Sequence, residues 1–195
     1  LFLLPSLQEK FTIPLFSYLL FKLEKAREEG LDRSTILFII SFSIPLIKLQ
    51  GSVFILFVFV YFFYFRTKSS VISLLGFALS IFIQAYLRFF TNSGYYVLEK
   101  TPTQILNNLL SLQNLLFIVV ILLSGFFAFK DNNKETKIYI NGFCLSGLGI
   151  IFILINWDSY GYLYGFYTFF LCILVPYCIV SVSERLNFKF LNNLI

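Results

Sequence analysis

The sequence predicts an all-α, polytopic transmembrane protein with about six crossings and an N-terminal interfacial helix. Hydrophobic residues make up 58% of the 195 residues and charged residues only 13%, about half the charged share of an ordinary soluble domain. The mean hydropathy is +0.84. A soluble globule of this size cannot bury that much apolar surface, whereas a bilayer accepts helices of roughly 20 apolar residues.

Residues 1–33 form the first predicted unit, an amphipathic N-terminal segment. Its apolar stretch, Phe11–Phe21, is too short to cross a membrane. The residues that follow, Lys22–Glu29, are densely charged. We therefore expect a helix that lies in the membrane interface or only half enters the membrane.

Residues 34–184 form the predicted transmembrane domain, and residues 185–195 a short tail. The segment Ile36–Phe65 is interrupted at Lys48–Gly51, so it is either one strongly tilted helix or two short helices. Each of the four later apolar segments is expected to cross the membrane once, as a single helix. These segments are Val71–Phe90, Ile105–Phe129, Ile138–Asn156 and Tyr160–Val182, the last with a kink at Pro176.

The distribution of basic residues favours two helices in Ile36–Phe65. Lysine and arginine are enriched in the short loops that are not translocated across the membrane. One helix in this segment would divide the bases evenly, whereas two helices place twelve bases on one side and three on the other. The twelve are Lys10, Lys22, Lys25, Arg27, Arg33, Arg66, Lys68, Lys130, Lys134, Lys137, Arg185 and Lys189, and the three are Lys48, Arg88 and Lys100. We therefore expect six crossings, with both termini on the basic side (cytosol, stroma or matrix).

Several classes of catalytic and metal site are excluded by the residues that the chain lacks. It contains no histidine, which removes histidine-ligated haem, histidine zinc sites and Ser-His catalysis. No phosphate-binding loop or dinucleotide-binding glycine pattern is present. The acids lie only in loops and at segment ends, which argues against a proton- or sodium-coupled transporter. The three cysteines are expected to be small buried hydrophobes. We predict no catalytic, cofactor-binding or metal-binding residue, no cofactor and no enzymatic activity.

A polar stripe marks the start of the predicted helix Ile105–Phe129. Its members recur every three or four residues, which places them on one face of a single helix. They are Gln104, Asn107, Ser111 and Asn114. Such a stripe should face protein or water rather than lipid. It lines a polar path or makes hydrogen bonds between helices near the headgroups.

Two further features predict contacts between helices. Gly142, Ser146 and Gly149 lie on one face of the segment Ile138–Asn156, and small residues of this kind let a second helix approach closely. Gln84 lies within an apolar segment and needs a hydrogen-bond partner there.

The N-terminal third, about 60 residues, resembles a known family. The pattern consists of Ser17-Tyr18-Leu19-Leu20 with Glu24, then Ile44-Pro45-Leu46, then Ser52-Val53, Phe57, Phe59, Tyr61 and Arg66. It resembles the plastid inner-envelope protein-import channel family, namely the twenty-kilodalton subunit of the Tic translocon and its plastid-encoded relatives. Two later motifs of the family are absent, and Gly76-Phe77-Ala78 and Ser183-Glu184-Arg185-Leu186 stand in their places. Residues 91–158 contain at least one crossing more than the family pattern would lead us to expect.

The resemblance implies a four-helix core that contributes to a path for preproteins, with both ends in the stroma and no catalytic residues. Our first hypothesis is therefore a non-catalytic protein-transport subunit of an organellar translocase, in the chloroplast inner membrane. The alternative is a structural or accessory subunit of a photosynthetic or respiratory membrane complex, and a small-solute transporter is a third class. In the first two cases the partners are other membrane subunits of a hetero-oligomeric complex and lipids, with no nucleic acid, and the organelle is a plastid in preference to a mitochondrion.

Overall fold

The computed structural model describes residues 3–30, 34–47, 49–90, 101–156 and 164–186, and these residues form helices with no strand among them. The elements are α1 (Leu3–Glu29), α2 (Ser34–Ile47), the 3₁₀ helix η1 (Leu49–Val53), α3 (Phe54–Phe65), α4 (Lys68–Phe90), α5 (Pro102–Leu109), α6 (Leu112–Lys130), α7 (Lys134–Asn156) and α8 (Tyr164–Leu186). The all-α prediction is confirmed.

Three helices are long and apolar enough to cross a membrane. They contain the stretches Lys68–Leu87, Lys134–Ile153 and Gly165–Glu184. Shorter apolar helices cover Ser34–Ile47, Gln50–Phe65 and Asn114–Lys130. These lengths and compositions are compatible with a membrane protein. The number of crossings, six, stays a prediction.

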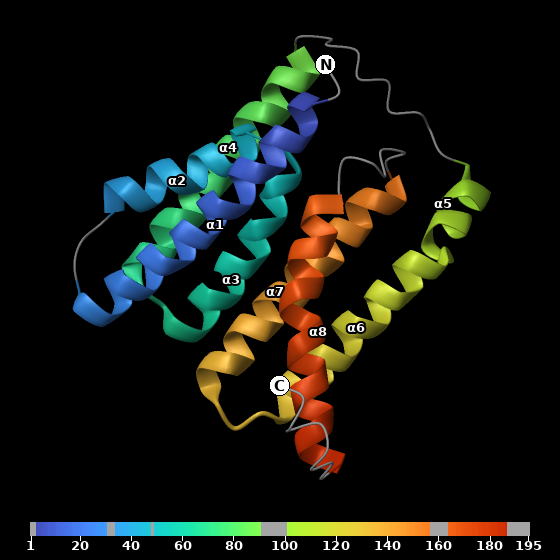
Figure 1. Cartoon of the computed structure of the whole chain (residues 1–195). Helices are drawn as coiled ribbons and strands as arrows, with labels where there is room; N and C mark the ends of the chain where they lie inside the picture. Colours follow the sequence, from blue (N-terminus) through green and yellow to red (C-terminus); the bar gives the residue numbers. More distant parts are fainter. Residues whose placement is uncertain (1–2, 31–33, 48, 91–100, 157–163, 187–195) are drawn as a thin grey trace.

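Most of the helices run side by side between an upper and a lower pole, whereas α2 begins at mid-height on the left (Figure 1). α2 packs on α4, α3 on α7, and α6 on both α7 and α8, while α1 lies against α2 and α8. At the lower pole in Figure 1 the end of α1 meets the turns α3–α4 and α6–α7. Lys10 lies twelve residues before Lys22 in α1, about 18 Å along the axis. Lys10 is therefore displaced from this pole, although the predicted topology places it on the same side of the membrane as the bases there.

Some of the predictions concern residues whose structure or side chains are not described. Arg33, Lys48, Lys100 and Lys189 lie outside the described residues, as does most of the predicted tail 185–195. Arg88 and Arg185 belong to α4 and α8, but their side chains are not described.

α1 is one continuous helix that includes the charged residues. It has 27 residues, about 40 Å in length. Phe16, Leu19 and Leu23 are buried against the other helices, whereas Phe11 and Phe21 are exposed. α1 thus contributes one face to the common core. Its position relative to a membrane interface stays a prediction.

The segment Ile36–Phe65 contains two helices, α2 and α3, joined by η1. Pro45 lies in the last turn of α2, where carbonyl groups lack intrahelical donors. Gln84 of α4 donates its side-chain amide to the Pro45 carbonyl at 2.5 Å, which supplies the partner that Gln84 was expected to need. At Gly51 a Cβ would come within 2.9 Å of side-chain atoms of Ile44 and Thr12. The chain therefore turns where α1 and α2 leave no room for a side chain.

The prediction of one helix over Ile105–Phe129 is wrong. α5 ends at Leu109 and α6 begins at Leu112. Ser111 between them has φ −58° and ψ 139°, and its hydroxyl accepts from the Asn114 backbone N–H at 3.4 Å. A serine hydroxyl in this position satisfies a free N–H at a helix start. Ser111 thus acts as the N-cap that begins a new helix.

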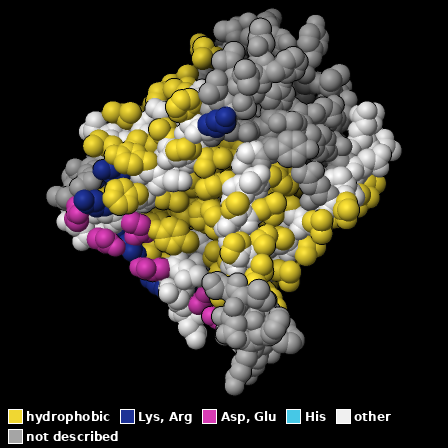
Figure 2. Space-filling view, in the orientation of Figure 1, with side chains coloured by type: hydrophobic (Ala, Val, Ile, Leu, Met, Phe, Trp, Pro, Cys, Tyr) yellow, Lys and Arg dark blue, Asp and Glu magenta, His cyan; other side chains and the backbone are white. Residues whose placement is uncertain are grey.

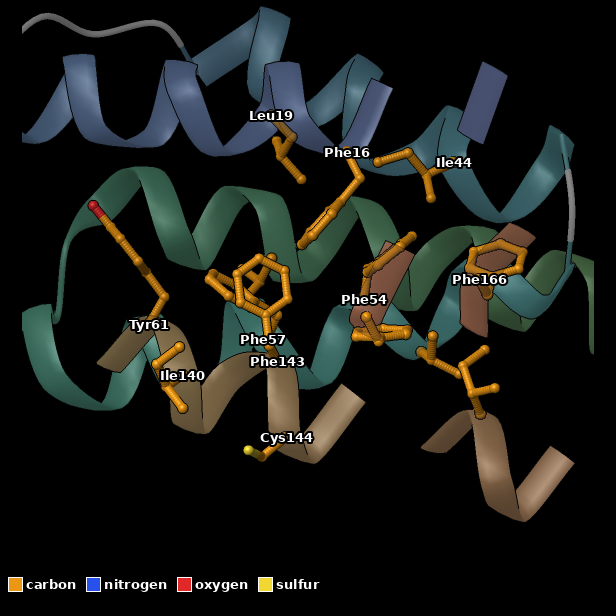
Figure 3. Close-up of a cluster of buried hydrophobic side chains, with 14 of the residues drawn as sticks. Phe16, Leu19, Ile44, Phe54, Phe57, Tyr61, Ile140, Phe143, Cys144 and Phe166 are labelled. Atoms are coloured by element: carbon orange, nitrogen blue, oxygen red, sulfur yellow. The ribbon is translucent and has the colours of Figure 1, made fainter. Parts of the chain in front are cut away.

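The core between α1, α3, α7 and α8 is built from aromatic rings (Figure 3). Phe16 of α1 stacks on Phe54 of α3, with 3.7 Å between ring centroids. Phe57 of α3 packs on Phe143 of α7 at 4.8 Å. Phe166 of α8 lies 5.8 Å from Phe54. Rings from four helices therefore interlock in one cluster, which joins α1 and α3 of the N-terminal half of the chain to α7 and α8 of the C-terminal half.

Candidate functional site

A cluster of charged and phenolic side chains joins α1 to α7 at the lower pole. Arg27 forms ion pairs with Glu24 at 2.6 Å and with Glu135 at 2.9 Å. The Tyr139 hydroxyl of α7 donates to the Glu24 carboxylate. We call Glu24, Arg27, Glu135 and Tyr139 the ion-pair cluster. The cluster connects distant parts of the sequence, since Arg27 and Glu135 lie 108 positions apart.

Aromatic rings line the inner side of the ion-pair cluster. The Arg27 guanidinium lies 4.3 Å from the centroid of the Phe65 ring, a distance at which the ring face attracts a cation. Tyr61 is buried beside Glu24 and Arg27. The Arg27 guanidinium, the aromatic rings of α3 and the carboxylates of the ion-pair cluster together hold α1, α3 and α7 in contact.

The electrostatics of the ion-pair cluster keep Arg27 charged. Burial lowers the pKa of the guanidinium, but the hydrogen bond to Glu135 and the negative charge of Glu24 outweigh it and raise the pKa above its ordinary value. Arginine is protonated at physiological pH in any case. Among the described residues no three His, Cys, Asp or Glu side chains lie close enough to hold a metal ion. The arrangement is suited to holding helices together.

The predicted polar stripe does not lie on one helix, because the break at Leu110–Ser111 separates α5 from α6. Gln104 accepts a hydrogen bond from the Thr101 backbone N–H at 3.0 Å, next to the start of α5. Asn107 is exposed on α5, and Ser111 caps α6. Asn114 is buried and accepts from the Tyr167 hydroxyl of α8. Two members of the stripe therefore serve helix ends and a third joins two helices.

The small-residue face of α7 lies against α3 and η1. A Cβ on Gly142 would be 2.6 Å from a ring carbon of Phe57. A Cβ on Gly149 would be 3.0 Å from Leu56 and 3.3 Å from Val53. Ser146 between them is fully buried. The three residues form a shallow notch that receives side chains of α3 and of the preceding turn.

The cysteines occupy different environments. Cys144 is buried in α7 and donates to the Ile121 carbonyl at 3.4 Å. Cys178 of α8 is half-buried and lies 2.9 Å from the Ser124 hydroxyl. Cys172 is exposed, so the expectation that all three are buried is wrong for this residue. It lies on the outer side of α8, which neighbouring helices leave uncovered.

Sequence reasoning missed the ion-pair cluster and the pair formed by Asn114 and Tyr167. Arg27 and Glu135 each lie at the end of a helix, where charged residues are ordinary and carry no signal of a partner. Tyr167 could be read only as one of several aromatic residues near a helix start. A tyrosine within an apolar helix does indicate a nearby polar partner, but it does not identify which one.

No family model, curated protein or solved structure matches this chain. The resemblance of the N-terminal third therefore depends on its own residues. Several of these lie close together in the structure. Leu19, Phe57 and Tyr61 are buried in the core, and Glu24 belongs to the ion-pair cluster.

Proposed function

We propose that the chain is a non-catalytic membrane subunit of an organellar multiprotein complex, and that the complex is a protein-import translocase. The observation that carries the first part is the contrast between a well-packed interior and wide apolar outer faces. Figure 2 shows hydrophobic side chains over much of one face, with most of the charged residues toward its lower left and one basic side chain in its upper part. Such faces need lipid or neighbouring helices to cover them.

Large apolar side chains are exposed on the outer faces of α4 and α6. Leu75 and Phe82 on α4 are 57% and 67% exposed, and Leu122 and Phe129 on α6 are 62% and 75% exposed. The apolar stretches of α4 and α8 are each 28% buried within the chain, against 50% for that of α7. α7 is thus the central helix, and α4 and α8 have surface available for partner subunits.

The import function is supported by the resemblance of the N-terminal third and by polar groups outside the core. Gln104 and Asn107 are exposed on α5, and Ser111 is half-buried beside them. They offer a polar surface next to the start of α6. Because the buried Asn114 is already bonded to Tyr167, a path for a preprotein would run along this surface and be completed by partner subunits.

The bond between Asn114 and Tyr167 favours a second candidate, a structural subunit of a photosynthetic or respiratory complex. A buried side-chain hydrogen bond between α6 and α8 fixes two helices together. A subunit that only supports its neighbours needs such contacts and no polar path. The two candidates therefore differ in whether water reaches α5 and the start of α6.

Identification of co-purifying proteins tests the proposal directly. The tagged full chain is solubilised from its native membrane in mild detergent, and its complex is separated on a native gel. Co-migration with inner-envelope translocon proteins is expected. Co-migration with a photosystem or respiratory complex would establish the second candidate instead. Migration as a lone chain would contradict membership of any complex.

Reactivity of single cysteines tests for a polar path. In a background with Cys144, Cys172 and Cys178 replaced by alanine, Asn107→Cys and Ser111→Cys are expected to react with a membrane-impermeant thiol reagent. Leu116→Cys is the matched control, because Leu116 is 58% exposed on the apolar face of α6. It should stay unmodified, since lipid disfavours the reactive thiolate. Protection of both polar positions would rule out the path.

A further inference from the structure

The turn between α6 and α7 and the start of α7 carry three lysines within eight residues of sequence. Lys130 ends α6, Lys134 begins α7, and Lys137 follows one turn later. Lys130 and Lys134 are exposed and Lys137 is half-exposed. We call these three residues the lysine cluster. The question is which negative charge they face.

The two acids of the turn are engaged elsewhere. Both carboxylate oxygens of Asp131 accept hydrogen bonds, one from the Asn133 backbone N–H at 2.8 Å and one from the Tyr177 hydroxyl at 3.2 Å. Glu135 forms its ion pair with Arg27 of α1. None of the three lysines forms an ion pair with a described residue. The ammonium groups therefore have no carboxylate partner in the part of the chain that the structure describes.

Each ammonium group lies over an aromatic ring. Lys130 is 4.2 Å from the ring centroid of Phe126, Lys137 is 4.8 Å from that of Phe129, and Lys134 is 5.8 Å from that of Phe65. The Phe126 and Phe129 rings are 52% and 75% exposed. Lysine ammonium groups and exposed rings in this combination are typical of the boundary between hydrocarbon and headgroups.

We propose that the lysine cluster binds the phosphate headgroup of an anionic phospholipid, whose acyl chains lie against Phe126 and Phe129. The proposal rests on the membrane location of the chain, but not on which complex it joins. Three cations without acid partners attract an anionic headgroup. The exposed rings favour a lipid over a free anion, because a soluble phosphate would gain nothing from them.

Lys137 also forms a hydrogen bond at the end of α6, and the test has to leave this bond in place. Its ammonium group donates to the Phe129 carbonyl at 2.9 Å, and so satisfies one of the free carbonyls at the end of α6. Replacement of Lys137 could therefore disturb the end of the helix. A variant with only Lys130 and Lys134 replaced leaves this bond in place.

The experiment measures binding of fluorescently labelled phosphatidylglycerol to the purified full chain in a nonionic detergent. Unlabelled phosphatidylglycerol is expected to displace the probe, whereas phosphatidylcholine and inorganic phosphate are not. The variant Lys130→Gln/Lys134→Gln should weaken binding about twentyfold, and the triple variant with Lys137→Gln on the order of a hundredfold, at about fivefold for each lysine. The charge-preserving variant Lys130→Arg/Lys134→Arg/Lys137→Arg should bind as the wild type does.

The matched control removes two lysines from α1, namely Lys10 and Lys25, each replaced by glutamine, and is compared with Lys130→Gln/Lys134→Gln. It changes the net charge by the same amount as that double variant and should leave the affinity unchanged. Equal weakening by both double variants would overturn the site, since net charge alone would then explain the binding. Displacement by inorganic phosphate would show a free-anion site, and equal displacement by phosphatidylcholine would show no headgroup preference. Either result overturns the proposal, and neither bears on which proteins co-purify with the chain.

Discussion

Two close helix contacts, α2 on α4 and α3 on α7, are both built on glycine but differ in what the glycine faces. A Cβ on Gly76 of α4 would be 2.8 Å from the Phe38 carbonyl oxygen and 3.2 Å from the Phe42 backbone nitrogen. For a Cβ on Gly142 of α7, the three nearest atoms would instead be ring carbons of Phe57, at 2.6 to 3.0 Å. In the first contact backbone lies on backbone, and in the second a side chain fills a notch.

The surroundings of the two glycines differ in the same way. Near Gly76, Ser41 and Ser73 turn their hydroxyls back to carbonyls of their own helices, at 2.7 and 3.0 Å. Around Phe57, the rings of Phe16 and Phe143 fill the space. The difference teaches that α2 and α4 are held at a separation set by main-chain atoms. The contact between α3 and α7, which joins the N-terminal to the C-terminal half of the chain, depends on how the rings pack. These rings can shift, whereas main-chain atoms cannot.

The largest effect is expected at Gly76. Gly76→Ala forces the new methyl group against main-chain atoms of α2, which cannot rotate away. The variant should lose about 1–3 kcal/mol of the free energy of unfolding, measured by circular dichroism during unfolding in mixed detergent micelles. Wild-type stability in this variant would show that α2 moves freely on α4.

Gly125 of α6 provides the matched control for Gly76. The nearest atom to a Cβ there is the Cys144 sulfur, at 4.0 Å. Gly125→Ala therefore adds no clash and removes a flexible residue from a helix, so it should raise the free energy of unfolding by about 0.5–1 kcal/mol. A loss at Gly125 equal to that at Gly76 would mean that contact distance does not decide the outcome.

The two glycine contacts also show what the sequence can and cannot predict. The spacing of Gly142, Ser146 and Gly149 indicates a helix-packing face, and α4 carries a similar set in Ser73, Gly76 and Ser80. Both sets pack closely on another helix. Neither pattern says which helix is the partner or whether it presents a carbonyl or a ring, because that depends on residues far away in the chain.

The helical fold class could be predicted because hydropathy and segment length are local properties. The break between α5 and α6 could not be predicted in this way, since the polar residues that begin the segment 105–129 keep a helical spacing up to its apolar run. Ser111 and Asn114 were interpreted as members of a stripe, but their spacing of three is equally that of an N-cap and the backbone N–H it satisfies. The ion pair of Arg27 with Glu135 needs the tertiary arrangement, as it joins two distant helix ends.

An intermediate effect is expected at Gly142, and it should be open to rescue. Gly142→Ala places a methyl group against the buried Phe57 ring and should lose about 1–3 kcal/mol, at the lower end of the range if the ring shifts. Phe57→Leu removes the opposing ring atoms. The double variant should therefore lose less than the sum of the two single variants, by about 0.5–3 kcal/mol, in the same unfolding measurement.

The corresponding double variant in the α2–α4 contact is the control. Phe38 faces Gly76 with its carbonyl oxygen, so Phe38→Leu leaves the obstruction unchanged. Gly76→Ala and Phe38→Leu should then be additive to within about 0.5 kcal/mol. Rescue at Gly76 but not at Gly142 would reverse the distinction between a backbone contact and a ring contact.

The smallest effect is expected from the ion pair between Arg27 and Glu135, which joins α1 to α7 at the lower pole. The Glu135 side chain is 60% exposed, so Glu135→Gln should cost only about 0–1 kcal/mol. Because the Debye length falls to roughly 3 Å at 1 M salt, this loss should disappear there. Arg27→Gln should cost more than Glu135→Gln, since it also removes the pair with the less exposed Glu24 and the contact with Phe65. If Glu135→Gln destabilised the chain as much as Gly142→Ala does, charge rather than ring packing would hold α7 in place.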